Sequence, residues 1–215
     1  MDERQLREAI CDVGQRLHER GFVAAWDGNI SARLPGGSFL CTPTMCSKGR
    51  LIPDELCTVD DAGRQLSGPR GRTSEILLHL AIYRHRLDVQ AVVHSHAPHA
   101  SAFAVCGEPV PSGVLAEAEY FLGSVPTVPY TLPGTQAFAD SVVPYLNGSR
   151  ALILANHGAV TFGPTLELAW GYTEVLDAYC RVLLLSRSLG SPRRLTDDQV
   201  AELAELKRRT ECGGS

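Results

Sequence analysis

Apolar residues recur at helical spacing in several parts of the chain. The first helix is expected over residues 2–20, and Gly21 is expected to terminate it. Its apolar face consists of five residues at helical spacing: Leu6, Ala9, Ile10, Val13 and Leu17. Further helices are expected over residues 98–105, 135–146 and 196–209, and a long one after Gly163-Pro164. Another helix, for which Thr73 or Ser74 is the expected N-cap, is expected to end near Arg86. These segments alternate with segments of a different pattern.

Short β-branched and apolar runs between these helices predict strands. A hairpin is expected over 29–34 and 38–42, and further strands over 56–59, 64–66, 89–96, 125–130, 151–156 and 159–162. Strands and helices mix without a strict βαβ order. We therefore expect an α/β fold in which residues 1–215 form a single domain, with a mixed, largely antiparallel central sheet covered by helices. The last residues, 211–215, are expected to fray.

Composition and charge narrow the functional classes. The 20 Lys and Arg against 24 Asp and Glu give a net charge of −4, which disfavours nucleic-acid binding. The apolar runs fall far short of the roughly 18 residues that a membrane span needs, and the charged N-terminus does not resemble a secretory signal. The seven cysteines are an odd number without a C-x-x-C pair, which favours thiols in a reducing cytoplasm. No nucleic-acid or membrane partner is expected.

Histidines at the ends of two predicted strands are the main candidates for chemistry. His94 and His96 lie two residues apart, so a strand would point both rings to one face, where they could share a metal ion. The alternative is a pair of partly buried histidines that hydrogen-bond to the backbone. His157 ends a later strand before Gly158, and a third imidazole there would leave a coordination position open for substrate. His18, His79 and His85 fall in helical patterns and are expected to be surface or packing residues, and His99 a polar neighbour.

A carboxylate and several small polar residues could complete the site. Glu75 has two interpretations. It is either an acid at the helix N-terminus, where its charge interacts favourably with the helix dipole, or a carboxylate beside the metal that ligates it or moves a proton. Turns and a helix N-terminus rich in small donors could bind phosphate. These residues are Gly28, Asn29, Thr44, Thr73 and Ser74.

Taken together, these segments resemble the class II aldolase/adducin superfamily, in particular enzymes of the L-fuculose-1-phosphate aldolase type. The matching segments are Gly28-Asn29-Ile30-Ser31-Ala32-Arg33, Thr42-Pro43-Thr44, Thr73-Ser74-Glu75, Ala91-Val92-Val93-His94-Ser95-His96 and Ala155-Asn156-His157-Gly158. The resemblance implies a zinc ion, with Mn²⁺ or Co²⁺ as alternatives, held by three imidazoles and one carboxylate: His94, His96, His157 and Glu75. It further implies that Glu75 is the acid/base, that the five small polar residues hold phosphate, and that the chain is a homotetramer with its sites at subunit interfaces.

The chain departs from this family at two places. Met45 stands where the family has glycine, and the segment Ser47-Lys48-Gly49 is an alternative source of phosphate contacts. The tyrosine proton donor of the fuculose-phosphate enzymes has no clear match, which leaves Glu117, Tyr120 and Tyr130 as candidates.

The resemblance implies a metal-dependent aldolase that cleaves a small ketose 1-phosphate, of the fuculose or 5-deoxypentulose type, to dihydroxyacetone phosphate and a short aldehyde. The same superfamily also contains sugar-phosphate epimerases, dehydratases and decarboxylases, and adducin-like modules that bind without catalysis. The spacing of the motifs does not separate these activities.

Overall fold

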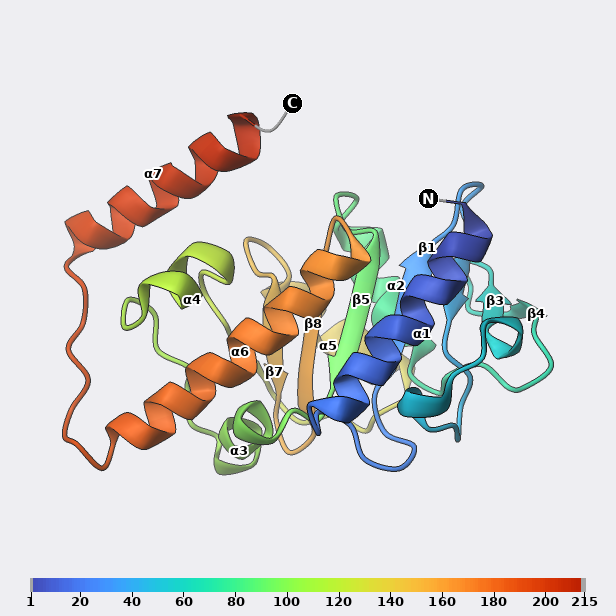
Figure 1. Ribbon diagram of the computed structural model, residues 1–215, viewed down its shortest axis with the longest axis horizontal. Helices are drawn as coiled ribbons and strands as arrows, with labels where there is room; N and C mark the ends of the chain where they lie inside the picture. The colour runs from blue at the N-terminus through green and yellow to red at the C-terminus, as the bar shows by residue number, and fades with distance from the viewer. Residues whose placement is uncertain (1, 214–215) are drawn as a thin grey trace.

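An eight-stranded sheet forms the middle of the molecule in the computed structural model, which describes residues 2–213 (Figure 1). Its strands are β1 (Asn29–Arg33), β2 (Phe39–Cys41), β3 (Cys57–Val59), β4 (Gln65–Ser67), β5 (Ala91–Ser95), β6 (Thr127–Val128), β7 (Ala151–Leu154) and β8 (Gly158–Gly163). They lie in the order β4-β3-β2-β1-β5-β8-β7-β6, and β6 with β7 is the parallel pair in an otherwise antiparallel sheet. The predicted fold class is confirmed.

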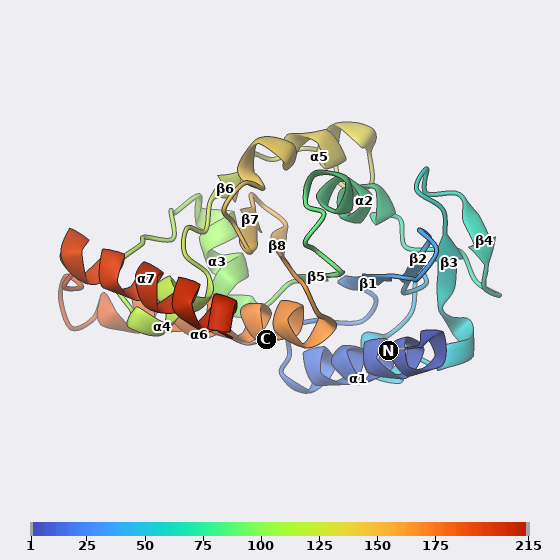
Figure 2. The ribbon, with the colours of Figure 1, turned by 90° about the horizontal axis from the view of Figure 1, so that it is seen from above.

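Helices cover both faces of this sheet. They are α1 (Glu3–Glu19), α2 (Ile76–His85), α3 (Pro98–Cys106), α4 (Ala116–Phe121), α5 (Gln136–Ser141), α6 (Leu166–Ser186) and α7 (Asp197–Gly213), with single 3₁₀ turns at Lys48–Arg50, Pro53–Glu55 and Val143–Tyr145. Figure 2 shows α2 and α5 over one face, and α1 and α6 over the other. Each face has its own apolar core, because side chains alternate along a strand: Val93 of β5 packs with α1 and α6, and Val92 packs with α2. His94, two residues after Val92, therefore lies on the α2 side.

Prolines shorten two of the expected elements. The strand expected over 125–130 is the two-residue β6, since Pro126 and Pro129 flank it and have no N–H for the sheet. The helix expected over 135–146 ends at Ser141, because Pro144 interrupts the helical hydrogen bonds and the chain continues as a 3₁₀ turn. α4 was not predicted at all: at six residues, it is too short to show a helical period.

The C-terminal helix α7 stands away from the sheet and lies over α4 (Figure 1). It runs to Gly213 rather than ending near residue 209. Residues 214 and 215, which belong to the segment expected to fray, lie outside the described residues. Within residues 2–213, no helix combines the length and the apolar character that are needed to cross a bilayer.

Candidate metal centre and its pocket

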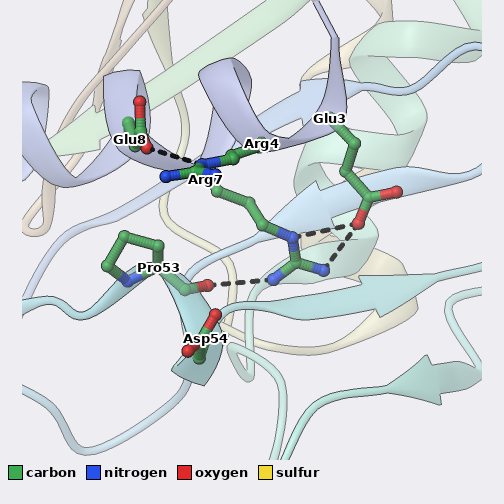
Figure 3. Close-up of a pocket in the computed structure, with 6 residues that line it drawn as sticks. All are labelled: Glu3, Arg4, Arg7, Glu8, Pro53 and Asp54. Atoms are coloured by element: carbon green, nitrogen blue, oxygen red, sulfur yellow. Dashed lines mark hydrogen bonds and ion pairs between the residues drawn. The ribbon is translucent and has the colours of Figure 1, made fainter.

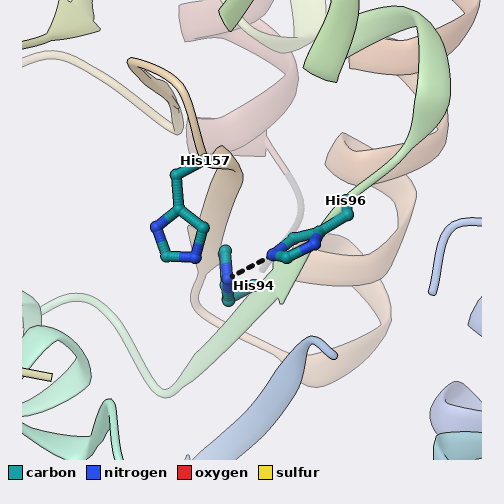
Figure 4. A group of neighbouring side chains, drawn as sticks. All are labelled: His94, His96 and His157. Carbon is teal, nitrogen blue, oxygen red and sulfur yellow. Dashed lines mark hydrogen bonds between the residues drawn. The ribbon is translucent and has the colours of Figure 1, made fainter. Parts of the chain in front are cut away.

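Three histidines from two separate parts of the chain meet at the end of β5 (Figure 4). His94 lies within β5, where β1 and β8 pair with it on either side; His96 follows the strand, and His157 lies in the turn from β7 to β8. Their ring centroids lie 5.0 Å (94–96), 4.7 Å (94–157) and 5.1 Å (96–157) apart. One nitrogen from each ring can be chosen so that all three lie within 4.8 Å of one another.

The turn that carries His157 depends on its two neighbours. Asn156 has a positive φ of 55°, which asparagine tolerates better than most residues. At Gly158, a Cβ atom would lie 2.6 Å from the backbone oxygen of Ser95 and 2.8 Å from Cδ2 of His96. The Asn-His-Gly sequence therefore allows β8 to approach β5 closely enough for the His157 ring to reach the other two.

The Nδ1 atoms of His94 and His96 have partners outside the centre, which leaves their Nε2 atoms facing it. His94 Nδ1 lies 2.9 Å from the backbone oxygen of Ala159, which only accepts, so Nδ1 carries the proton. Burial, reinforced by His157 and His96, lowers the pKa of His94 well below its usual value, so its ring is neutral and Nε2 carries a lone pair. Asp27 Oδ2 lies 3.2 Å from His96 Nδ1, a contact that orients the His96 ring and leaves its Nε2 toward the other imidazoles. These two Nε2 atoms lie 3.2 Å apart, the contact dashed in Figure 4.

Glu75, directly before α2, adds a carboxylate to this group. Its Oε2 lies 3.3 Å from His94 Nε2, and its Oε1 lies 3.4 Å from His157 Nε2. Oε1 is buried and finds no hydrogen-bond donor among the described residues. Lone pairs at such distances repel one another unless a proton or a cation lies between them. The donor set of three imidazoles and a carboxylate therefore fits a divalent metal ion.

A cavity of about 180 Å³ opens beside this centre. All five residues predicted to bind phosphate line it: Gly28, Asn29, Thr44, Thr73 and Ser74. Two of them also form hydrogen bonds with Glu75: Asn29 Nδ2 donates to Glu75 Oε2, and Thr73 Oγ1 accepts from the Glu75 N–H. α2 begins at Ile76 with Glu75 as its N-cap residue, so neither Thr73 nor Ser74 is the N-cap. Gly28 has a φ of 67°, and a Cβ there would lie 2.6 Å from Val23 Cγ1 and 2.9 Å from the His94 oxygen.

Met45 and Lys48 contribute to the same cavity. Met45 adopts a φ of 51°, the left-handed conformation that suits a glycine, and its side chain stays 62% exposed, so the loop accommodates it without burying it. Lys48 is buried and donates from Nζ to the backbone oxygens of Cys46 at 2.6 Å and Trp26 at 3.0 Å. It is the one lysine or arginine among the described lining residues, and burial lowers its pKa.

The three candidate proton donors lie elsewhere in the described part of the chain. Glu117 and Tyr120 belong to α4, and Tyr130 lies in the loop after β6 with 58% of its surface exposed. None of the three is among the described residues that line the cavity.

A second hollow beside α1 is lined mainly by charged side chains, most of which pair with one another (Figure 3). Arg7 donates to Glu3 Oε1 at 2.9 Å and to the Pro53 oxygen at 3.0 Å, and Arg4 pairs with Glu8. These contacts attach α1 to the 3₁₀ turn Pro53–Glu55. This hollow is a structural contact between elements.

Three residues outside the predicted site have defined partners in the structure. Asp27, which orients His96, lies in a loop and has no periodic signal. His79 is fully buried and bonds to Asn29, so it is a packing residue with polar partners. His99 pairs with Asp177, whose Oδ1 also accepts from the His99 and Ala100 N–H groups at the start of α3.

We expect the metal-free protein to lose stability as the pH falls below about 6.5. Burial, reinforced by His94, lowers the pKa of His79 to about 3, so the unfolded chain takes up a proton at a pH where the folded chain does not. The free energy of unfolding should then decrease by about 1.4 kcal/mol per pH unit for each such histidine. Urea unfolding with EDTA at several pH values would measure the slope. His79→Gln should make it shallower, and a flat profile for the unmodified protein would contradict the expectation.

Comparison with known proteins agrees with the geometry. The family model described as Class II Aldolase and Adducin N-terminal domain matches residues 8–184. The chain is 33% identical over 207 residues to a 3-oxo-tetronate 4-phosphate decarboxylase of Escherichia coli (strain K12), covering 94% of this chain and 96% of the relative. It is 29% identical over 201 residues to a 5-deoxy-D-ribulose 1-phosphate aldolase of Bacillus thuringiensis, covering 93% of each.

A solved structure shows the same fold. An L-fuculose 1-phosphate aldolase superposes with a TM-score of 0.89 at 25% identity, covering 95% of this chain and 96% of that one. On this sequence and structural similarity, the chain belongs to the class II aldolase/adducin family.

Proposed function

We propose that the protein is a metal-dependent lyase that releases CO₂ from a small phosphorylated 3-oxo sugar acid, leaving dihydroxyacetone phosphate. The observation that carries this proposal is a buried carboxylate oxygen, Glu75 Oε1, which has no hydrogen-bond donor among the described residues and lies beside three converging imidazoles. The similarity to the 3-oxo-tetronate 4-phosphate decarboxylase supports the substrate class.

The electron balance of this reaction defines what the site must do. When the bond between the carboxylate carbon and its neighbour breaks, CO₂ leaves and its bonding pair becomes an enolate of the adjacent ketone. A divalent ion at the centre supplies Lewis-acid stabilisation for the negative charge that develops on the ketone oxygen. We propose zinc, with Mn²⁺ or Co²⁺ as alternatives, held by four residues: His94, His96, His157 and Glu75. A proton must finally reach the carbon that CO₂ has left.

Residues of this chain can carry out the remaining tasks. Glu75 can relay a proton from solvent to the carbon that CO₂ has left through Oε1, which the described residues leave without a donor. The Lys48 ammonium beside the cavity provides positive potential for an anionic substrate. Thr44, Thr73 and Ser74 line the cavity with hydroxyl groups, and we propose that these hold the phosphate and so fix the position of the reacting carbons.

Aldol cleavage of a ketose 1-phosphate is the second candidate, supported by the similarity to the 5-deoxy-D-ribulose 1-phosphate aldolase. It leaves the same three-carbon enediolate, but an aldehyde departs in place of CO₂, so a second group must remove a hydroxyl proton. The candidates for that group, Glu117, Tyr120 and Tyr130, do not line the described cavity. The higher identity to the 3-oxo-tetronate 4-phosphate decarboxylase, 33% against 29% for the aldolase, favours decarboxylation as the first proposal.

A substrate panel separates the two reactions. The purified protein, loaded with zinc, would be incubated with 3-oxo-tetronate 4-phosphate isomers and with ketose 1-phosphates, and dihydroxyacetone phosphate, CO₂ and aldehyde would be measured separately. We expect CO₂ and dihydroxyacetone phosphate in equal amounts from a 3-oxo acid. Aldehyde from a ketose phosphate without CO₂ from any acid would support the second candidate, and the absence of all three products would contradict both.

We also propose that the protein acts in the cytoplasm as a homotetramer. Light scattering of the purified chain would test the assembly.

A further inference from the structure

Polar side chains of α2 and β1 alternate in one buried row that leads to Glu75. Glu75, His79 and Tyr83 follow one another at four-residue spacing, and Asn29 and Ser31 lie two residues apart on β1. Four residues of a helix advance by about 6 Å and two residues of a strand by about 6.7 Å, so the two sets of side chains can interleave. This match of spacings lets every member of the row contact a member of the other element.

The contacts in this row are short and continuous. Asn29 Nδ2 lies 2.8 Å from Glu75 Oε2, and Asn29 Oδ1 lies 2.5 Å from His79 Nε2. His79 Nδ1 lies 2.7 Å from Ser31 Oγ, which lies 2.8 Å from the Tyr83 hydroxyl. The four residues behind the carboxylate are at most 5% exposed, so water does not compete for these bonds.

The carboxylate fixes the direction of every bond in the row. Glu75 Oε2 accepts, so Asn29 must present its amide N–H to it and its Oδ1 to the histidine. His79 must then donate from Nε2, and its neutral ring accepts at Nδ1 from the Ser31 hydroxyl. Ser31 is left to accept from Tyr83. All four donors therefore point toward Glu75, an arrangement in which each bond polarises and strengthens the next.

We infer that His79 is a positioning residue of the metal centre: its Nε2–H sets the orientation of the Asn29 amide, and this amide holds Glu75 Oε2 so that Oε1 faces His157. The role given to Glu75 rests on the proposed function, whereas the bond order within the row does not. If the histidine donor is lost, the Asn29 amide can turn over and present an oxygen to the carboxylate, which repels it. The carboxylate would then lose its fixed rotamer beside the imidazoles.

Matched variants test this role in the full-length protein. His79→Leu fills much of the space but removes both polar contacts, whereas His79→Gln keeps an N–H that can reach Asn29. For His79→Leu, we expect Zn²⁺ affinity, measured by chelator competition, to fall by about 10- to 100-fold, the range for residues that orient metal ligands. The kcat should fall with little change in KM, because substrate contacts remain. His79→Gln should restore most of both values, and Tyr83→Phe, at the far end of the row, should change the affinity by less than about threefold.

A measurement on the unmodified protein avoids any folding defect in the variants. Nitrogen-15 NMR of the His79 ring, assigned by its loss in His79→Gln, should show a protonated Nε2 and a bare Nδ1. The opposite tautomer would overturn the inference, as would a folded His79→Leu protein with unchanged Zn²⁺ affinity. Neither readout involves a substrate. If the panel shows no turnover while both results hold, the proposed function fails and the positioning role stands.

Discussion

Glu75→Gln should leave the fold and much of the metal content intact and reduce turnover by about 10³-fold, within the range expected for loss of a positioned acid/base. The amide keeps the size of the side chain and an oxygen for the metal, but it cannot carry a proton to and from the substrate. The affected atom would be Oε1, which lies 3.4 Å from His157 Nε2. The measurement is kcat on the substrate that the panel identifies, together with the zinc content of the same sample.

Glu117→Gln is the matched control for this variant. Glu117 is an exposed glutamate of α4 outside the described lining of the cavity, so its substitution should leave kcat unchanged if Glu75 moves the proton. A fully active Glu75→Gln protein would remove Glu75 from the mechanism. A large loss in Glu117→Gln would instead restore that residue as a proton donor.

His94→Ala should lower the zinc content from about one ion per chain to a small fraction of that value, because removing a ligand costs more than the 10- to 100-fold of an outer contact. His94 has the most central position of the three rings: its Nε2 lies near both His96 and Glu75, and the ring is fully buried between β1 and β8. Atomic absorption on dialysed protein measures the content. Unchanged stoichiometry would argue against this ligand set.

Two further variants make that result specific. His85→Ala removes an exposed histidine from the last turn of α2 and should keep the full zinc content. Since His94→Ala also opens a cavity in the core, thermal unfolding must show that it remains folded. His157→Ala removes a second predicted ligand. His157 is only partly buried, so this variant should lose less packing than His94→Ala, and it should lose zinc as well.

Local pattern was sufficient where an element is long or its chemistry is carried by neighbours. α1, α6 and the buried strands follow from periodicity, and the two-residue spacing of His94 and His96 placed both rings at one strand end. Local pattern was insufficient where proline or short length decides the outcome, as in β6, α5 and α4. Local pattern predicted Asn29 as a phosphate contact but did not predict its hydrogen bond to Glu75, which the structure shows.

Periodicity along the chain predicted the fold class, because it depends on neighbouring positions. The candidate ligands and the five phosphate residues were predicted from short motifs and from their resemblance to a known family. The tertiary structure decided which groups meet. The pairing of β5 with β1 and β8 brings Asn29 opposite His94 and His157 beside it, and the packing of α2 on β1 places His79 behind Glu75. Such contacts depend on strand order and on the match between helix and strand spacing. Both join residues that are far apart in the chain, so the pattern of neighbouring residues does not predict them.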